Sequence, residues 1–181
     1  MPARQVAFLR AVNVAGHAVV KKDDLKRAFS DAGCRNVATY IQSGNVIFDE
    51  PAGERRVLRA EIQANLNTLL GGTATIIYRS LSHLRQLLQS NPFEAVDPAS
   101  DVKLYVAFLA KAPSRRPVYP LLEPKEELRA VASEKDDVYI VSGRKNNGFY
   151  GFPNKFIEKE LGVLATSRNW NTIARIVEKF K

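Results

Sequence analysis

Residues 6–16 read Val-Ala-Phe-Leu-Arg-Ala-Val-Asn-Val-Ala-Gly, and this stretch decides how the chain begins to fold. Its first four residues are apolar, Arg10 and Asn13 then interrupt the run, and it ends in a loop at Gly16 and His17. This pattern is typical of a buried strand that delivers polar side chains into the loop after it. A solvated loop supplies the same polar residues, so the stretch predicts a strand and leaves the role of its polar end open.

Strands and helices alternate over the next sixty residues. The expected elements are a helix over 25–32, strands over 36–42 and 46–48, a helix over 58–70 and a strand over 73–78. Asp23 and Asp24 suit the start of the first helix, where carboxylates meet the positive end of the helix dipole. Gly33 suits its end, and Gly71 stops the second helix. The resulting order, β-α-β-β-α-β, predicts a ferredoxin-like unit with both helices on one face of a four-stranded sheet.

The sequence of the second half of the chain predicts a further mixture of strands and helices. The expected elements are a linking helix over 80–90 capped by Ser80, a strand over 102–109, a helical turn at 118–122, strands over 128–132 and 138–141, a helix from Pro153 to Gly162, and a last helix from Trp170 capped by Thr166 or Ser167. The predicted class is therefore α+β. Residues 1–90 form a ferredoxin-like subdomain with its linking helix, and residues 91–181 form a second, smaller α+β subdomain that ends in two helices.

The chain is strongly basic, with a formal net charge of +8 and a pI of about 9.7. Residues 1–90 hold 12 basic and 7 acidic residues, and residues 91–181 hold 15 and 12, so both halves contribute. A basic surface favours anionic partners such as nucleic acid, nucleotides or phosphorylated metabolites. A lysine-rich solvated surface explains the same charge without any partner.

Cysteine and histidine are too few for several common kinds of site. Cys34 is the only cysteine and is expected to be buried, and His17 and His83 are the only histidines. An intrachain disulfide is therefore impossible, and no Cys/His metal site is expected. The sequence has no Walker loop, GxGxxG, HExxH or GxSxG motif, so no cofactor is expected. With no signal-peptide pattern and no long apolar run, the chain is expected to be cytoplasmic and not bound to a membrane.

Polar residues that carry the candidate site gather in a few places. The candidate ligand-binding residues are Arg10, Asn13, Gln42, Ser43, Asn45, Lys155, Arg168, Asn169, Asn171 and Thr172. Lys155 and Arg168 are expected near the starts of the last two helices. A cation there lies near the positive end of the helix dipole and destabilises the helix by about 0.3–1 kcal/mol. An anion bound there lets the cation and the backbone N–H groups act together. A long side chain that points into water is the alternative explanation.

Three stretches resemble the signatures of the bacterial domain-of-unknown-function 1697 family. They are Phe8–Gly16, Tyr40–Phe48 and Thr166–Thr172, and together they extend from the first strand to the last helix. The first stretch departs from the family pattern because alanine stands at positions 11 and 15, where the family has glycine. The resemblance implies two α+β subdomains, the first ferredoxin-like, and it implies no established activity. It also implies that the candidate residues other than Lys155 are signature positions.

Three functions remain open from the sequence. The first is binding of an anionic small molecule or nucleic acid in a basic cleft between the subdomains. The second is a small enzyme that polarises its substrate with arginine, asparagine, glutamine and serine side chains, although few carboxylates are near the motifs to act as a general base. The third is that the signature side chains hydrogen-bond one another where the subdomains dock. The sequence does not define the oligomeric state.

Overall fold

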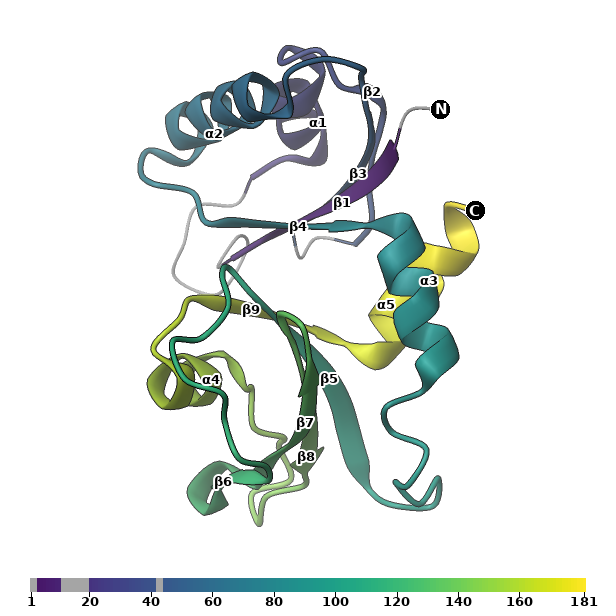
Figure 1. Ribbon diagram of the computed structural model, residues 1–181, viewed down its shortest axis with the longest axis vertical. Helices are drawn as coiled ribbons and strands as arrows, with labels where there is room; N and C mark the ends of the chain where they lie inside the picture. Colours follow the sequence, from purple (N-terminus) through teal and green to yellow (C-terminus); the bar gives the residue numbers. More distant parts are fainter. Residues whose placement is uncertain (1–2, 11–19, 42–43) are drawn as a thin grey trace. The chain divides into compact units, whose positions relative to one another are not determined.

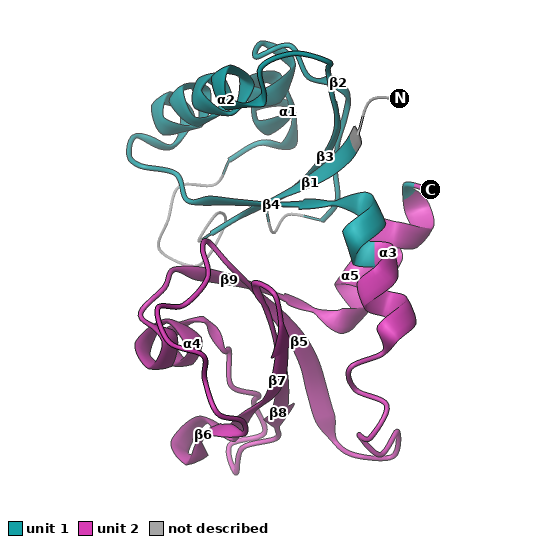
Figure 2. Cartoon of the chain, in the orientation of Figure 1, with its two compact units in different colours: residues 1–84, 180 teal, residues 85–179, 181 magenta. Residues whose placement is uncertain are grey.

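A computed structural model describes residues 3–10, 20–41 and 44–181. The chain divides into two compact units, residues 1–84 with Phe180 and residues 85–179 with Lys181 (Figure 2). The division falls within helix α3 (Leu81–Ser90), whereas the sequence places the boundary after residue 90. No helix in the described part of the chain has the length and apolar composition needed to cross a membrane.

The first unit is a four-stranded antiparallel sheet with two helices. Its elements are β1 (Ala3–Leu9), α1 (Lys22–Ser30), β2 (Arg35–Thr39), β3 (Asn45–Glu50), α2 (Arg55–Leu70) and β4 (Ile76–Ser80). The strand order is β2-β3-β1-β4, so β3 lies between β1 and β2 and runs antiparallel to both. This order is consistent with the predicted ferredoxin-like unit.

Both helices of the first unit cover the same face of its sheet (Figure 1). Alternate residues of β1, such as Ala7 and Leu9, meet Phe29 of α1 and Ile62 of α2 in one buried cluster. The helices present apolar stripes because their leucines, isoleucines and phenylalanines recur at helical spacing. At the end of α2, Gly71 adopts φ +65°, and its backbone N–H bonds the last turn, which ends the helix there.

The second unit is a five-stranded antiparallel sheet in the order β6-β7-β8-β5-β9. Its strands and helices are β5 (Val102–Leu109), β6 (Leu121–Glu123), the 3₁₀ turn η1 (Pro124–Glu126), β7 (Leu128–Glu134), β8 (Asp137–Gly143), α4 (Asn154–Leu161), β9 (Ala165–Asn169) and α5 (Trp170–Lys179). Helix α4 buries Phe156, Ile157 and Leu161 in a cluster with one face of this sheet. Since side chains alternate along a strand, residues such as Val106, Val141 and Arg168 lie on the opposite face.

The structure confirms the α+β class and corrects several details. Residues 118–122 form no helical turn, because Leu121–Glu123 pairs with β7 as an edge strand. Thr166 and Ser167 do not cap the last helix. They lie within β9, which pairs with β5 and separates α4 from α5. Pro153 precedes α4 and is not its first residue. Gly33 ends α1 as predicted, because it adopts φ +93°, its backbone N–H donates to the Ser30 carbonyl, and that of Cys34 donates to the Phe29 carbonyl.

Candidate functional site

Two of the candidate residues lie at one end of the first sheet. Arg10 follows β1, is half-buried, and its backbone N–H donates to the Thr75 carbonyl at 2.9 Å. Asn45 is fully buried, and its Nδ2 donates to the Tyr40 carbonyl at 3.0 Å. The backbone N–H of Tyr40 returns a bond to the Asn45 carbonyl at 3.1 Å. The Asn45 amide therefore closes the connection between β2 and β3.

Other candidate residues of the first unit cannot be placed. Asn13, Gln42 and Ser43 lie outside the described residues, as does His17. Their roles as ligand contacts stay predictions. The same holds for ligand contacts by Arg10 and Asn45, whose described bonds are those of the fold.

Arg168 is the most unusual of the candidates because its charge is buried. It lies on β9, opposite Val106 of β5, and is only 7% exposed. Its Nη1 donates to the Thr166 hydroxyl at 2.8 Å and to the Ser167 carbonyl at 2.9 Å. Burial lowers the pKa of Arg168 to about 10, because a poorly hydrated environment disfavours the charged form. A desolvated cation therefore stands two residues before α5.

The remaining candidates of this segment lie at the start of α5. Asn169 directly precedes the helix, and its Oδ1 accepts the backbone N–H of Asn171 at 2.9 Å. Asn169 is thus an N-cap, a role that the sequence assigned to Thr166 or Ser167. The side chain of Asn171 is exposed and that of Thr172 is half-buried, both in the first turn of α5. Arg168, Asn169, Asn171 and Thr172 are therefore brought together in the β9–α5 segment, residues 166–172.

Lys155 lies on a different element. It is exposed in the first turn of α4, whose preceding residue, Pro153, gives no side-chain cap. Its position near a helix start is as the sequence predicted, and a role in ligand binding stays a prediction.

A buried ionic cluster in the first unit was missed by the sequence analysis. Glu50, at the end of β3, is 5% exposed, and its carboxylate oxygens lie 2.9 Å from the Nε of Arg55 and 3.4 Å from the Nε of Arg59. The guanidinium of Arg59 also lies 4.3 Å from the centroid of the Tyr78 ring. The sequence signal was the pair of arginines four residues apart at the start of α2, which places both on one helical face. These contacts pair the charge of Glu50 within the unit, with one hydrogen bond from Arg55 to Oε2, and they give Glu50 a structural role.

Cys34 lies close enough to this cluster to be affected by it. The thiol is buried, and burial together with the negative charge of Glu50 raises its pKa to about 11. At neutral pH the thiol is therefore protonated and a poor nucleophile. The expected burial of Cys34 is confirmed. In the described part of the chain, no group of three His, Cys, Asp or Glu side chains is arranged to hold a metal ion.

The basic loop after β8 is occupied by ion pairs of its own. The Asp101 carboxylate accepts a hydrogen bond from the Tyr150 hydroxyl and one from Arg144. The Tyr150 hydrogen bond is the main cause that lowers the pKa of Asp101. Lys145 pairs with Glu126 at 3.0 Å. These charges hold the loop against β5 and η1, so they are poor candidates for a ligand.

Residues 3–139 match the model of a family described as "Protein of unknown function (DUF1697)". The chain belongs to this family. Two of the three signature stretches fall within the matched residues of this DUF1697 protein, and the third, Thr166–Thr172, follows them.

The DUF1697 protein is also similar to a solved structure, a conserved bacterial protein, SP0830, from Streptococcus pneumoniae. The two chains share 18% sequence identity over 100% of each, with a TM-score of 0.67. At this identity the likeness supports the fold alone. No curated protein matches the chain. The comparisons therefore give a family and a fold, and no activity.

Proposed function

We propose that this protein binds a small phosphate-bearing molecule through the β9–α5 segment. The observation that carries the proposal is the burial of the Arg168 guanidinium, which lowers its pKa to about 10. Withdrawing a cation from water is unfavourable by several kcal/mol, and a bound anion offsets that cost. Arginine is well suited to the task because its planar guanidinium can contact two phosphate oxygens at once.

The start of α5 supplies the other donors of the proposed site. Backbone N–H groups in the first turn of a helix favour a bound anion. The exposed amide of Asn171 and the hydroxyl of Thr172 add side-chain donors in that turn. The Asn169 side chain is already engaged as the cap and orients this end of the helix. All of these residues belong to the second unit.

A small ligand suits this segment better than a nucleic acid. Binding to a nucleic-acid backbone uses many exposed cations, each against a separate phosphate. Arg168 is 7% exposed, so a terminal phosphate group reaches it more easily than a phosphate within a polymer. The net charge of +8 raises the local concentration of either kind of anion. Phosphorylated metabolites and nucleotides are abundant in the cytoplasm, which we propose as the location of this protein.

A structural role is the second candidate, and specific hydrogen bonds favour it. Asn45 closes the β2–β3 connection, Asn169 caps α5, and Arg168 bonds to Thr166 and Ser167. On this account the signature residues hold the fold together and contact no ligand. The two candidates differ in what a neutral side chain at position 168 changes: stability in one case, ligand binding in the other.

A thermal-shift experiment with matched variants separates the two candidates. The probes are pyrophosphate, ATP and a short single-stranded oligonucleotide, because a ligand bound only to the folded state raises the melting temperature. The variant is Arg168→Gln, and the control is Arg175→Gln, which removes an exposed charge from α5. We expect pyrophosphate or ATP to raise the melting temperature of the wild type and the control, and not that of Arg168→Gln.

A second variant covers the case in which Arg168→Gln does not fold. Asn171→Ala with Thr172→Val removes two side-chain donors at exposed and half-buried positions and leaves the buried arginine in place. It should weaken pyrophosphate binding while the melting temperature without ligand changes little. Equal shifts in all variants would remove the β9–α5 segment from the site. A shift with the oligonucleotide alone, lost as salt rises, would favour nucleic acid instead.

A further inference from the structure

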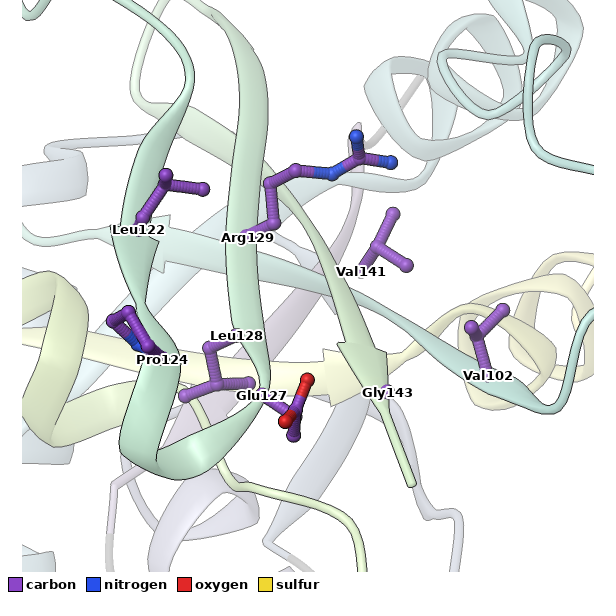
Figure 3. Close-up of a pocket in the computed structure, with 8 residues that line it drawn as sticks. All are labelled: Val102, Leu122, Pro124, Glu127, Leu128, Arg129, Val141 and Gly143. Carbon is purple, nitrogen blue, oxygen red and sulfur yellow. The ribbon is translucent and has the colours of Figure 1, made fainter. Parts of the chain in front are cut away.

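The second unit has a hollow on the face of its sheet that lies opposite α4. The hollow has a volume of about 340 Å³ and lies over β6, β7, β8 and the start of β5. Figure 3 shows Leu122 on one side, Val141 and Val102 on the other, and Gly143 at the end of β8 between them. Its size is at the lower end of the range for pockets that hold small ligands.

Strand register explains why the hollow exists. Leu122, Arg129 and Val141 lie directly across from one another on three adjacent strands, and the next row on the same face holds Gly143 opposite Val102. Every other residue of these rows carries a side chain, whereas Gly143 has none and has the Glu127 side chain beside it. Leu122 is 59% exposed although it is apolar, so the lining offers hydrophobic surface to a ligand.

Two opposite charges flank this apolar surface. Arg129 projects from β7 at one end of the hollow, and the Glu127 carboxylate lies at the other end, beside Gly143 (Figure 3). A Cβ placed on Gly143 would be 3.6 Å from Oε2 of Glu127. Within residues 3–10, 20–41 and 44–181, neither side chain forms an ion pair or a hydrogen bond, with each other or with a third group. Each charge is therefore available to a ligand.

We propose that this hollow binds a short apolar peptide with free ends. The apolar side chains of the peptide cover Leu122, Val141 and Val102, its carboxylate contacts Arg129, and its ammonium group contacts Glu127 over Gly143. Two residues of extended chain span about 7 Å, so the two end charges of a dipeptide are held apart, as Arg129 and Glu127 are at the two ends of the hollow (Figure 3). A single amino acid carries both charges on one carbon, whereas Arg129 and Glu127 lie at opposite ends of the hollow (Figure 3). This site is separate from the β9–α5 segment.

Calorimetric titration with the dipeptide Leu-Leu tests the proposal. Gly143→Val places a side chain in the hollow, and its Cβ would meet the Cβ of Glu127 at 3.4 Å, an ordinary van der Waals contact; valine is also favoured in strands. We expect Gly143→Val to abolish binding, and Arg129→Gln and Glu127→Gln each to weaken it about tenfold or more. Arg175→Gln, with an exposed charge on α5, should bind as the wild type does.

Two further probes test the role of the end charges. N-acetyl-Leu-Leu-amide has the same apolar body without charged ends, and free leucine has both charges without the length. Both should bind at least about tenfold more weakly than Leu-Leu. Equal affinity of the blocked peptide would overturn the charge pairing. Absence of Leu-Leu binding to the wild type, or binding unchanged in a folded Gly143→Val protein, would overturn the site.

Discussion

Two buried charges in this protein are held in different ways. Glu50 of the first unit is surrounded by the guanidinium groups of Arg55 and Arg59, at 2.9 and 3.4 Å. Arg168 of the second unit is as deeply buried, and the contacts that it makes with its own strand are to a hydroxyl and a carbonyl oxygen. The charge of Glu50 is thus paired within its unit, whereas burial lowers the pKa of Arg168 to about 10.

The two residues differ in what burial does to their charge. The charges of an ion pair within one unit already neutralise each other. Such a pair stabilises the unit and has little tendency to bind a further ion. A guanidinium whose pKa is lowered by burial is less favourable in the folded protein than in water, and a bound anion reverses that penalty. The burial of Arg168 therefore supports the proposed anion site, and the comparison with Glu50 can be tested from both sides.

The largest effect is expected for Glu50→Gln. The change removes the common partner of two arginines and should lower the free energy of unfolding by about 2–4 kcal/mol, because buried pairs are costly to break. We expect a loss toward the lower end of this range, because the side chains of Arg55 and Arg59 are 60% and 32% exposed and can be hydrated once Glu50 is replaced. Urea denaturation at neutral pH measures it. Glu61→Gln, an exposed control on α2, should change stability by less than about 0.5 kcal/mol.

Arg168→Gln should lower the free energy of unfolding less than Glu50→Gln does. The glutamine amide can still donate to the oxygens of Thr166 or Ser167, and the buried charge is gone. A loss for Arg168→Gln equal to that for Glu50→Gln would erase the contrast between the two charges.

The dependence of the unfolding free energy on alkaline pH reports on the pKa of Cys34, which is raised by burial and by the charge of Glu50. Its thiol pKa is raised from 9.0 to about 11, so the folded protein holds the proton more tightly than the unfolded chain does. The resulting stability is fully present below about pH 9 and is lost as pH rises through 11, by about 2–3 kcal/mol. Cys34→Ala should make the decline in unfolding free energy between pH 9 and 11 shallower.

The unfolding free energy of Cys34→Ala should still decline somewhat as pH rises, because burial also raises the pKa of the neighbouring Tyr78. Urea denaturation at several pH values gives the slope for each protein. Identical slopes in the wild type and Cys34→Ala would show that the pKa of Cys34 is the same in the folded and unfolded states and is not raised by burial.

The smallest effect concerns the helix that follows Arg168. Asn169→Ala removes the cap of α5 and should lower the free energy of unfolding by about 1 kcal/mol. Asn171→Ala is the matched control, since that side chain is exposed in the same turn. Equal losses in urea denaturation would mean that the Asn169 cap contributes nothing to the stability of the second unit.

Elements with strong local signals were predictable from the sequence. The strongly apolar stretch Val102–Leu109 is the strand β5 with the predicted ends. Ser80 caps α3 as expected, because its hydroxyl accepts the backbone N–H of His83 at 3.1 Å. Gly71 ends α2 as predicted. In each case the residues that decide the structure are neighbours in the chain.

Elements that depend on distant partners were not predictable. The polar residues of β9 look like a helix start, and only pairing with β5 makes them a strand. Glu50 and its arginines meet because the chain turns at residues 51–54 between β3 and α2. Gly143 looks like the beginning of a loop, yet it ends β8 opposite Val102 and opens the hollow. Such sites arise from register and turns, which local patterns do not encode.

Calorimetric titration of pyrophosphate into the wild type, Arg168→Gln and Arg175→Gln tests the role of the buried arginine most directly. All three proteins should be shown to be folded at the temperature of the titration. We predict measurable binding to the wild type, the same affinity within about twofold for Arg175→Gln, and a loss of about tenfold or more for Arg168→Gln, equivalent to at least about 1.4 kcal/mol. Equal affinities for the two variants, or no binding to the wild type, would contradict the account.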